Sequence, residues 1–126
     1  MKHYKSYFSI PAAPEEVYLG LTHPLTVQLW TGEPAEMSDE PGTEFSLFDG
    51  AIVGQNLEFE KGKKIVQRWY FDGVTDDSIV TIKLHPDKGR TSLELRHENI
   101  PEEDYEDIVD GWDNVYMAAL REFYEE

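Results

Sequence analysis

His97 is the residue whose type and position point most directly to chemistry. It lies in the segment Thr91–Glu98, where alternation places it on the same face as Leu93 and Leu95. We expect the ring to point toward an internal cavity, where burial lowers the pKa of an imidazole. Such a histidine could act as a general base or hydrogen-bond a ligand. The alternative is that His97 lies at the strand end and caps a backbone group.

Other reactive side chains do not form a recognisable catalytic or metal site. The four histidines, at positions 3, 23, 85 and 97, have none of the close spacings of metal ligands, so we expect no metal. The pair Asp76-Asp77 lacks the spaced acids and glycine of a calcium loop, and we interpret it as a solvated turn. There is neither a phosphate loop nor a nucleophile elbow. No cofactor and no catalytic residue are predicted.

Arg68 is unusual because it lies within the apolar segment Ile65–Phe71. Neighbouring residues of a strand face opposite ways, so Arg68 and Trp69 are expected on opposite sides of the sheet. If Trp69 faces the interior, Arg68 faces outward, and we expect it to pair with an acid such as Glu58 on the next strand. We interpret Arg68 as structural.

The charge balance limits the kinds of partner. The 126 residues include 26 Asp and Glu against 11 Lys and Arg, a formal net charge of −15. Nucleic acids and anionic membranes are disfavoured as partners, because both bind through lysine and arginine. The negative field could steer a basic partner or a cationic ligand, or simply keep the protein soluble.

Several absences point to a cytoplasmic protein. The chain has no cysteine, which excludes disulfides and thiolate sites. We find neither a signal peptide nor an apolar run long enough to span a membrane. The expected location is therefore the cytoplasm.

The elements that must position these residues follow from periodicity and turn residues. A strand is expected over Lys2–Ile10, then a helix from Pro14 that Gly20 and Pro24 cut short, then a helix over Leu25–Trp30. Antiparallel strands follow, separated by turns at Asp49-Gly50, Lys61-Gly62 and Pro86–Gly89; the expected strands are Thr43–Phe48, Ala51–Glu60, Lys63–Phe71, Ser78–His85 and Thr91–Glu98.

The C-terminal segment has the pattern of one long amphipathic helix. From Tyr105, apolar residues recur in steps of three and four, which predicts one broad helical face through five turns: Ile108, Val109, Trp112, Val115, Tyr116, Ala119, Leu120 and Phe123. Gly111 inside this helix costs about 1 kcal/mol relative to alanine, and we attribute it to a close approach of the sheet. On that interpretation, Gly111→Leu is severely destabilising.

This order of elements predicts a single α+β domain spanning residues 1–126. An antiparallel sheet with one apolar face needs a cover, and the long C-terminal helix has the apolar area to supply it. We therefore expect a curved antiparallel sheet wrapped around that helix, with two short helices after the first strand. Such an arrangement leaves room for a cavity between sheet and helix.

The sequence also resembles the activator of heat-shock protein 90 ATPase homologue family, of the START-related, birch-pollen-allergen-like superfamily. The resemblance spans almost the whole chain, and the segments that carry it are Pro14–Tyr18, Trp30, Asp49–Gly54, Ile65–Trp69, Val80–Leu84, Thr91–Leu95 and Gly111-Trp112. It implies the helix-grip fold. It also implies three alternative functions. The first is binding of a hydrophobic small molecule or lipid between sheet and helix, and the second is a co-chaperone-like protein contact in the stress response. The third is a cyclase- or hydrolase-like activity in the same cavity.

The first of these functions suits the apolar inventory best. A ligand cavity is mostly apolar with few polar groups. The residues expected to line it are Trp30, Phe45, Leu47, Trp69, Val80, Ile82, Leu93, Leu95, Trp112 and Tyr116, with His97 as a polar group. A chaperone or other protein partner remains the alternative, and the chain is compatible with a monomer or a homodimer formed through an edge strand.

Overall fold

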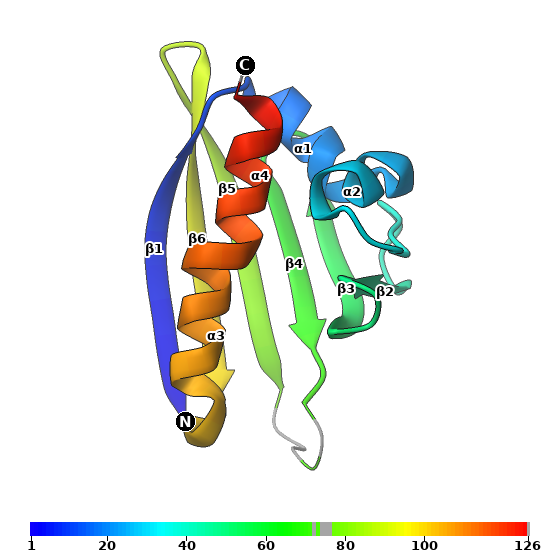
Figure 1. The fold of residues 1–126 in the computed structure, drawn as a ribbon, viewed down its shortest axis with the longest axis vertical. Helices are drawn as coiled ribbons and strands as arrows, with labels where there is room; N and C mark the ends of the chain where they lie inside the picture. Colours follow the sequence, from blue (N-terminus) through cyan, green and yellow to red (C-terminus); the bar gives the residue numbers. More distant parts are fainter. Residues whose placement is uncertain (72, 74–76, 126) are drawn as a thin grey trace.

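A long C-terminal helix crosses one face of a six-stranded antiparallel sheet in the computed structural model (Figure 1). The structure describes residues 1–71, 73 and 77–125. The strand order is β1-β6-β5-β4-β3-β2. The strands are β1 (Lys2–Ile10), β2 (Glu44–Leu47), β3 (Ile52–Glu60), β4 (Lys64–Trp69), β5 (Ser78–Asp87) and β6 (Arg90–Ile100). The helix-grip architecture expected from the sequence is confirmed.

The helical segments are two short helices after β1 and one long C-terminal run. The short ones are α1 (Pro14–Thr22) and α2 (Pro24–Thr31), which lie beside the upper half of the long helix in Figure 1. The C-terminal run consists of η1 (Glu102–Asp104), α3 (Tyr105–Gly111), the π-helical η2 (Trp112–Tyr116) and α4 (Met117–Tyr124).

Prolines start both short helices, but Gly20 does not end the first. Pro14 opens α1 with acids in its first turn, and Pro24 opens α2 and holds His23 extended. Helix α1 continues through Gly20 to Thr22, so the expected effect of Gly20 is wrong, whereas the helix does end just before Pro24 as expected. A Cβ on Gly20 would fall on the Tyr124 hydroxyl. The glycine therefore serves the packing of α1 against α4.

The β5–β6 hairpin is tighter than the sequence indicates. Pro86 and Asp87 pair with β6, so the turn is only Lys88-Gly89 rather than Pro86–Gly89. Both turn residues have positive φ, 53° and 82°. This is the backbone geometry that suits the twist of a two-residue hairpin.

The C-terminal helix contains a π turn that shifts its buried face. The Met117 amide donates to the Trp112 carbonyl, five residues back, so one turn holds an additional residue. Beyond this turn Met117 is fully buried, whereas Val115 is 49% exposed. The prediction of one unbroken face is therefore wrong at Val115 and at Phe123, which is 40% exposed.

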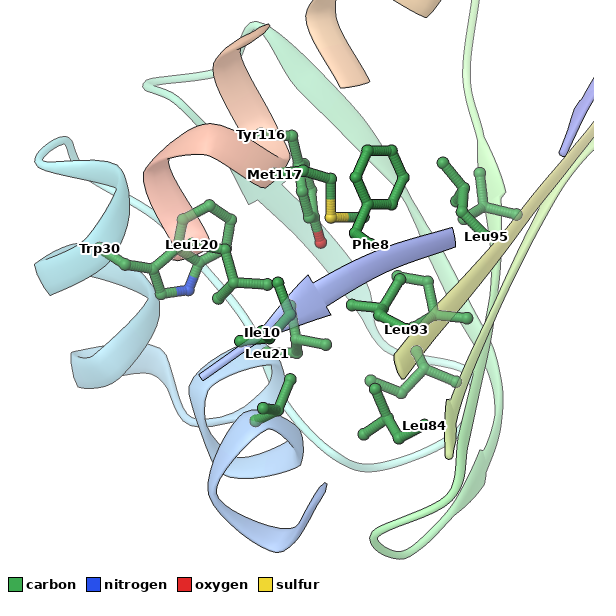
Figure 2. Close-up of a cluster of buried hydrophobic side chains, with 14 of the residues drawn as sticks. Phe8, Ile10, Leu21, Trp30, Leu84, Leu93, Leu95, Tyr116, Met117 and Leu120 are labelled. Carbon is green, nitrogen blue, oxygen red and sulfur yellow. The ribbon is translucent and has the colours of Figure 1, made fainter. Parts of the chain in front are cut away.

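The core lies between the concave face of the sheet and the helices. Figure 2 shows side chains of β1, the short helices, the sheet and α4 gathered together, including Ile10, Leu21, Leu93, Met117 and Leu120. The inward positions of β5 and β6 alternate as expected. This core, which includes Trp112 and Tyr116 of η2, fixes the C-terminal helix against the sheet.

Arg68 faces outward as predicted, but its partner is different. Its Nε lies 3.1 Å from Asp77 Oδ1, and its Nη1 donates to Gln55 Oε1 at 3.2 Å. Glu58 pairs instead with Lys64, at 3.0 Å. The partner expected for Arg68 was therefore wrong.

Most carboxylates lack a neutralising partner, which makes stability depend on salt. In the described part of the chain, ion pairs use only four of the acids, Glu58, Asp77, Glu94 and Glu102. We expect moderate salt to screen the remaining repulsion and stabilise the fold by about 1 kcal/mol, or roughly 4 °C in Tm. Thermal unfolding in low and moderate KCl measures this shift. An unchanged or lower Tm would contradict the prediction.

Candidate functional site

A cavity of about 520 Å³ opens between the C-terminal helix and the β2–β3 end of the sheet. Its walls come from the loop after α2, the β2–β3 turn, the end of β4, and the α3 and η2 segments. The lining residues are Glu33, Phe48, Ala51, Ile52, Trp69, Asp107, Ile108, Gly111, Trp112, Val115 and Tyr116. The cavity therefore joins segments that are far apart in the sequence.

Aromatic rings form much of the wall. Trp69 and Trp112 stack with ring centroids 4.8 Å apart and planes at 25°. Tyr116 lies 4.5 Å from Trp112, and Phe48 lies 6.4 Å from Tyr116. Trp112, Val115 and Tyr116 stand at i, i+3 and i+4 of the helix and lie on this one wall. The rings present a broad apolar surface.

Both tryptophan N–H groups of this wall are engaged with the protein. Trp112 Nε1 donates to His97 Nδ1 at 3.0 Å, and Trp69 Nε1 donates to Gln67 Oε1 at 3.1 Å. An indole has only this one donor. Neither Trp69 nor Trp112 has a donor left for a ligand, so what they offer is ring surface.

His97 is fully buried and fixed in one tautomer. Because Trp112 can only donate, His97 Nδ1 is the acceptor and Nε2 carries the proton, which it donates to Ser78 Oγ at 2.8 Å. The Ser78 hydroxyl in turn donates to the Glu98 carbonyl. Burial lowers the pKa of His97 to about 3, so the ring is neutral.

His97 accordingly serves the wall from behind and does not line the cavity. The sequence led us to expect His97 in the cavity lining; its ring is instead buried behind that lining, and burial lowers its pKa. The alternative of a backbone cap is not what the structure shows, because both ring nitrogens bond to side chains. With both nitrogens engaged, His97 cannot accept a proton from a ligand in this cavity.

A second buried polar chain, which the sequence analysis missed, holds Trp69. Gln67 Nε2 donates to Asn56 Oδ1 at 3.1 Å, and Asn56 Nδ2 donates to Thr43 Oγ1 at 3.2 Å. Gln67 and Asn56 are 3% and 0% exposed. The available signal was a glutamine at an inward position between Ile65 and Trp69.

The residues proposed from the sequence divide into two groups. Trp69, Trp112 and Tyr116 line the cavity. The others are buried in the core and not in its wall: Trp30, Phe45, Leu47, Val80, Ile82, Leu93, Leu95 and His97. Trp30 nevertheless packs edge-on against Tyr116, with centroids 5.0 Å apart, and donates its N–H to the Gly20 carbonyl.

Gly111 borders the cavity rather than a close contact with the sheet. A Cβ built at this position meets no heavy atom within 4 Å. The expected close approach is therefore wrong, and the destabilisation expected for Gly111→Leu loses its structural basis. The absence of a side chain here leaves space in the cavity wall.

The described residues offer no metal site and no membrane span. Among residues 1–71, 73 and 77–125, no three histidines or carboxylates converge as metal ligands. Of the acidic pair considered from the sequence, Asp76 lies outside the described residues, and Asp77 pairs with Arg68. No helix in the described part is long and apolar enough to cross a membrane.

The fold and sequence together define the class of protein. Residues 11–125 match the family described as "Activator of Hsp90 ATPase homolog 1-like protein", and the chain belongs to this family. The human activator of 90 kDa heat shock protein ATPase homolog 1 is 30% identical over 114 residues, which cover 89% of this chain and 34% of that protein. The Dictyostelium discoideum homologue is 31% identical over 112 residues, covering 86% and 29%. The chain thus spans about a third of the length of these relatives.

Solved structures of similar proteins have the same fold as this chain. An HSP90 activator from Plasmodium falciparum superposes with a TM-score of 0.86 at 27% identity, covering 98% of this chain and 96% of that one. The Aha1 dimer from Colwellia psychrerythraea gives a TM-score of 0.84 at 17% identity, covering 99% and 97%. The second likeness establishes the fold alone.

Proposed function

We propose that this domain binds a hydrophobic small molecule or lipid in the cavity beside η2. The observation that carries the proposal is the wall of stacked rings, in which the N–H groups of Trp69 and Trp112 are already bonded to the protein. An apolar ligand that covers these rings removes apolar surface from water, which is favourable in free energy.

The size and shape of the cavity support this proposal. Its volume of about 520 Å³ lies within the range of small-molecule sites. The buried chains through His97 and Gln67 hold two of the rings in place, so little ordering is needed on binding. The ligand that fits is apolar and of small-molecule size.

A fluorescent neutral probe, N-phenyl-1-naphthylamine, tests the proposal. We expect saturable binding with quenching of tryptophan fluorescence, and at least about 10-fold weaker binding to Gly111→Leu, which adds a bulky side chain at a lining position of the cavity. The matched control is Asn114→Leu, at an exposed position of the same helix that does not line the cavity. Equal binding by the wild type and both variants would contradict the proposal.

A second candidate function is contact with a chaperone. It is favoured by the likeness to the Plasmodium falciparum HSP90 activator, of which this chain covers 96%. The net charge of −15 would make such a contact with a basic surface sensitive to salt. The test is the ATPase rate of purified HSP90 with and without this protein at two salt concentrations. Stimulation that weakens with salt supports it, and an unchanged rate at both concentrations contradicts it.

The cyclase- or hydrolase-like alternative receives no such support. His97, the base that it would use, lies behind the wall with both nitrogens occupied. The titratable side chains that do line the cavity are Glu33, Asp107 and Tyr116. Burial raises the pKa of Tyr116, so this hydroxyl stays protonated.

A further inference from the structure

The charged side chains that line the cavity are all acidic. They are Glu33, from the loop after α2, and Asp107, from α3; no lysine or arginine is among the lining residues. Both are exposed, and within the described part of the chain neither lies within 4.0 Å of a basic group. Two carboxylates therefore lie at the boundary between the apolar wall and water.

The aromatic wall, like the two carboxylates, favours a positively charged ligand. The faces of tryptophan and tyrosine rings carry partial negative charge and attract cations. Trp69, Trp112, Tyr116 and Phe48 line the one cavity together, so a cation bound there lies next to aromatic rings. A cation with apolar substituents gains both from burial and from this attraction.

The surroundings of the cavity extend the negative field. Glu106 and Asp110 are exposed on α3, next to the lining residues of that helix, and the whole chain carries −15. A field of this sign attracts a cationic ligand and repels a fatty acid or another anion. The charge around the cavity thus discriminates between cationic and anionic ligands, which the apolar wall alone does not.

We propose that the cavity prefers an amphiphilic cation, an apolar body that carries an amine or quaternary ammonium group. The apolar body covers the rings of Trp69, Trp112 and Tyr116, and the cationic group lies at the boundary formed by Glu33 and Asp107. This inference rests on the proposed function, because it names the class of ligand for the same cavity.

Three probes with the same ten-carbon chain test it: decyltrimethylammonium, decanol and decanoate. The two charged probes are titrated below their micelle concentrations and decanol below its solubility limit, with tryptophan fluorescence as the readout. We expect the cation to bind about 5- to 10-fold more tightly than the alcohol, in line with the modest energy of exposed charge pairs, and decanoate to bind most weakly. Raising the salt concentration should reduce the difference.

The variants separate local from long-range electrostatics. Glu33→Gln combined with Asp107→Asn should remove most of the preference for the cation over decanol, and the aromatic rings and the long-range field supply what remains. The matched control, Glu103→Gln with Glu122→Gln, removes the same charge from exposed positions that do not line the cavity. It should retain the preference.

The outcomes distinguish this inference from the proposed function. Equal affinity for the cation and the alcohol would overturn the inference and leave hydrophobic binding intact. Equal loss of preference in both double variants would overturn the assignment to Glu33 and Asp107. Binding of none of the three probes would contradict the proposed function itself, and the inference with it.

Discussion

Gly54→Ala is expected to destabilise the fold by about 3 kcal/mol or more, at the upper end of the cost of overpacking. Gly54 is buried in β3, between Phe45 on β2 and Trp69 on β4. A Cβ there would collide with the Arg68 carbonyl oxygen and approach the Phe45 ring to 2.8 Å. Because a backbone carbonyl of the adjacent strand is involved, rotation of a side chain cannot relieve the collision.

The matched control is Gly111→Ala on the C-terminal helix. Its Cβ meets nothing within 4 Å, and alanine is favoured over glycine in a helix by about 1 kcal/mol, so the variant should be slightly more stable than wild type. Urea unfolding monitored by circular dichroism measures both variants. A midpoint for Gly54→Ala equal to that of wild type would contradict the account of the strand packing.

His97 should make the wild-type fold lose stability on acidification. The folded pKa of about 3 lies below the ordinary value of 6.5, so the unfolded chain binds a proton first as the pH falls. The stabilisation is complete above about pH 6.5 and is lost between there and pH 3; by pH 5 the loss is about 2 kcal/mol. Burial is the cause, since the rings of Trp69, Phe71 and Trp112 surround the imidazole.

The comparison with His97→Gln isolates this effect from the titration of the many carboxylates. Glutamine can accept from Trp112 and donate to Ser78, but does not titrate. Urea unfolding at pH 7 and pH 5 should show that the wild type loses about 2 kcal/mol more than the variant over this interval. Equal losses of stability in the wild type and the variant would mean that His97 is already protonated in the folded protein at pH 5, which would contradict the prediction.

The strands and their inward faces could be predicted because sheet alternation is local. Val80, Ile82 and Leu84 alternate with polar residues, and the structure places them in the core as expected. The C-terminal helix was also clear from its apolar spacing. Its π turn was not, because the 3.6-residue period assumes regular hydrogen bonds throughout, and Met117 becomes buried only where that period changes.

The cavity could be predicted only in part. Trp69, Trp112 and Tyr116 have the apolar, inward positions that the sequence pattern selects. Phe48 and Ala51 lie in a turn, where neither the strand nor the helix period indicates a face. Their proximity to the helix depends on the curvature of the sheet, which one sequence does not specify.

Arg68 shows a similar limit for surface pairs. The sequence places it outward, next to a strand that contains Glu58, but a bulge shifts the β3–β4 register between Asn56 and Glu58. Arg68 is opposite Ile79 on β5, and Asp77 is the diagonal neighbour on the same face. The choice of partner depended on register, which residue types alone did not determine.

The most direct test of ligand binding in this cavity is an NMR titration of the side-chain indole N–H signals. The chain has three tryptophans, and only Trp69 and Trp112 line the cavity. With saturating N-phenyl-1-naphthylamine, we expect large shifts for the indoles of Trp69 and Trp112 and a smaller one for Trp30, whose N–H is bonded to Gly20 outside the cavity. No shift, or a largest shift at Trp30, would contradict the account.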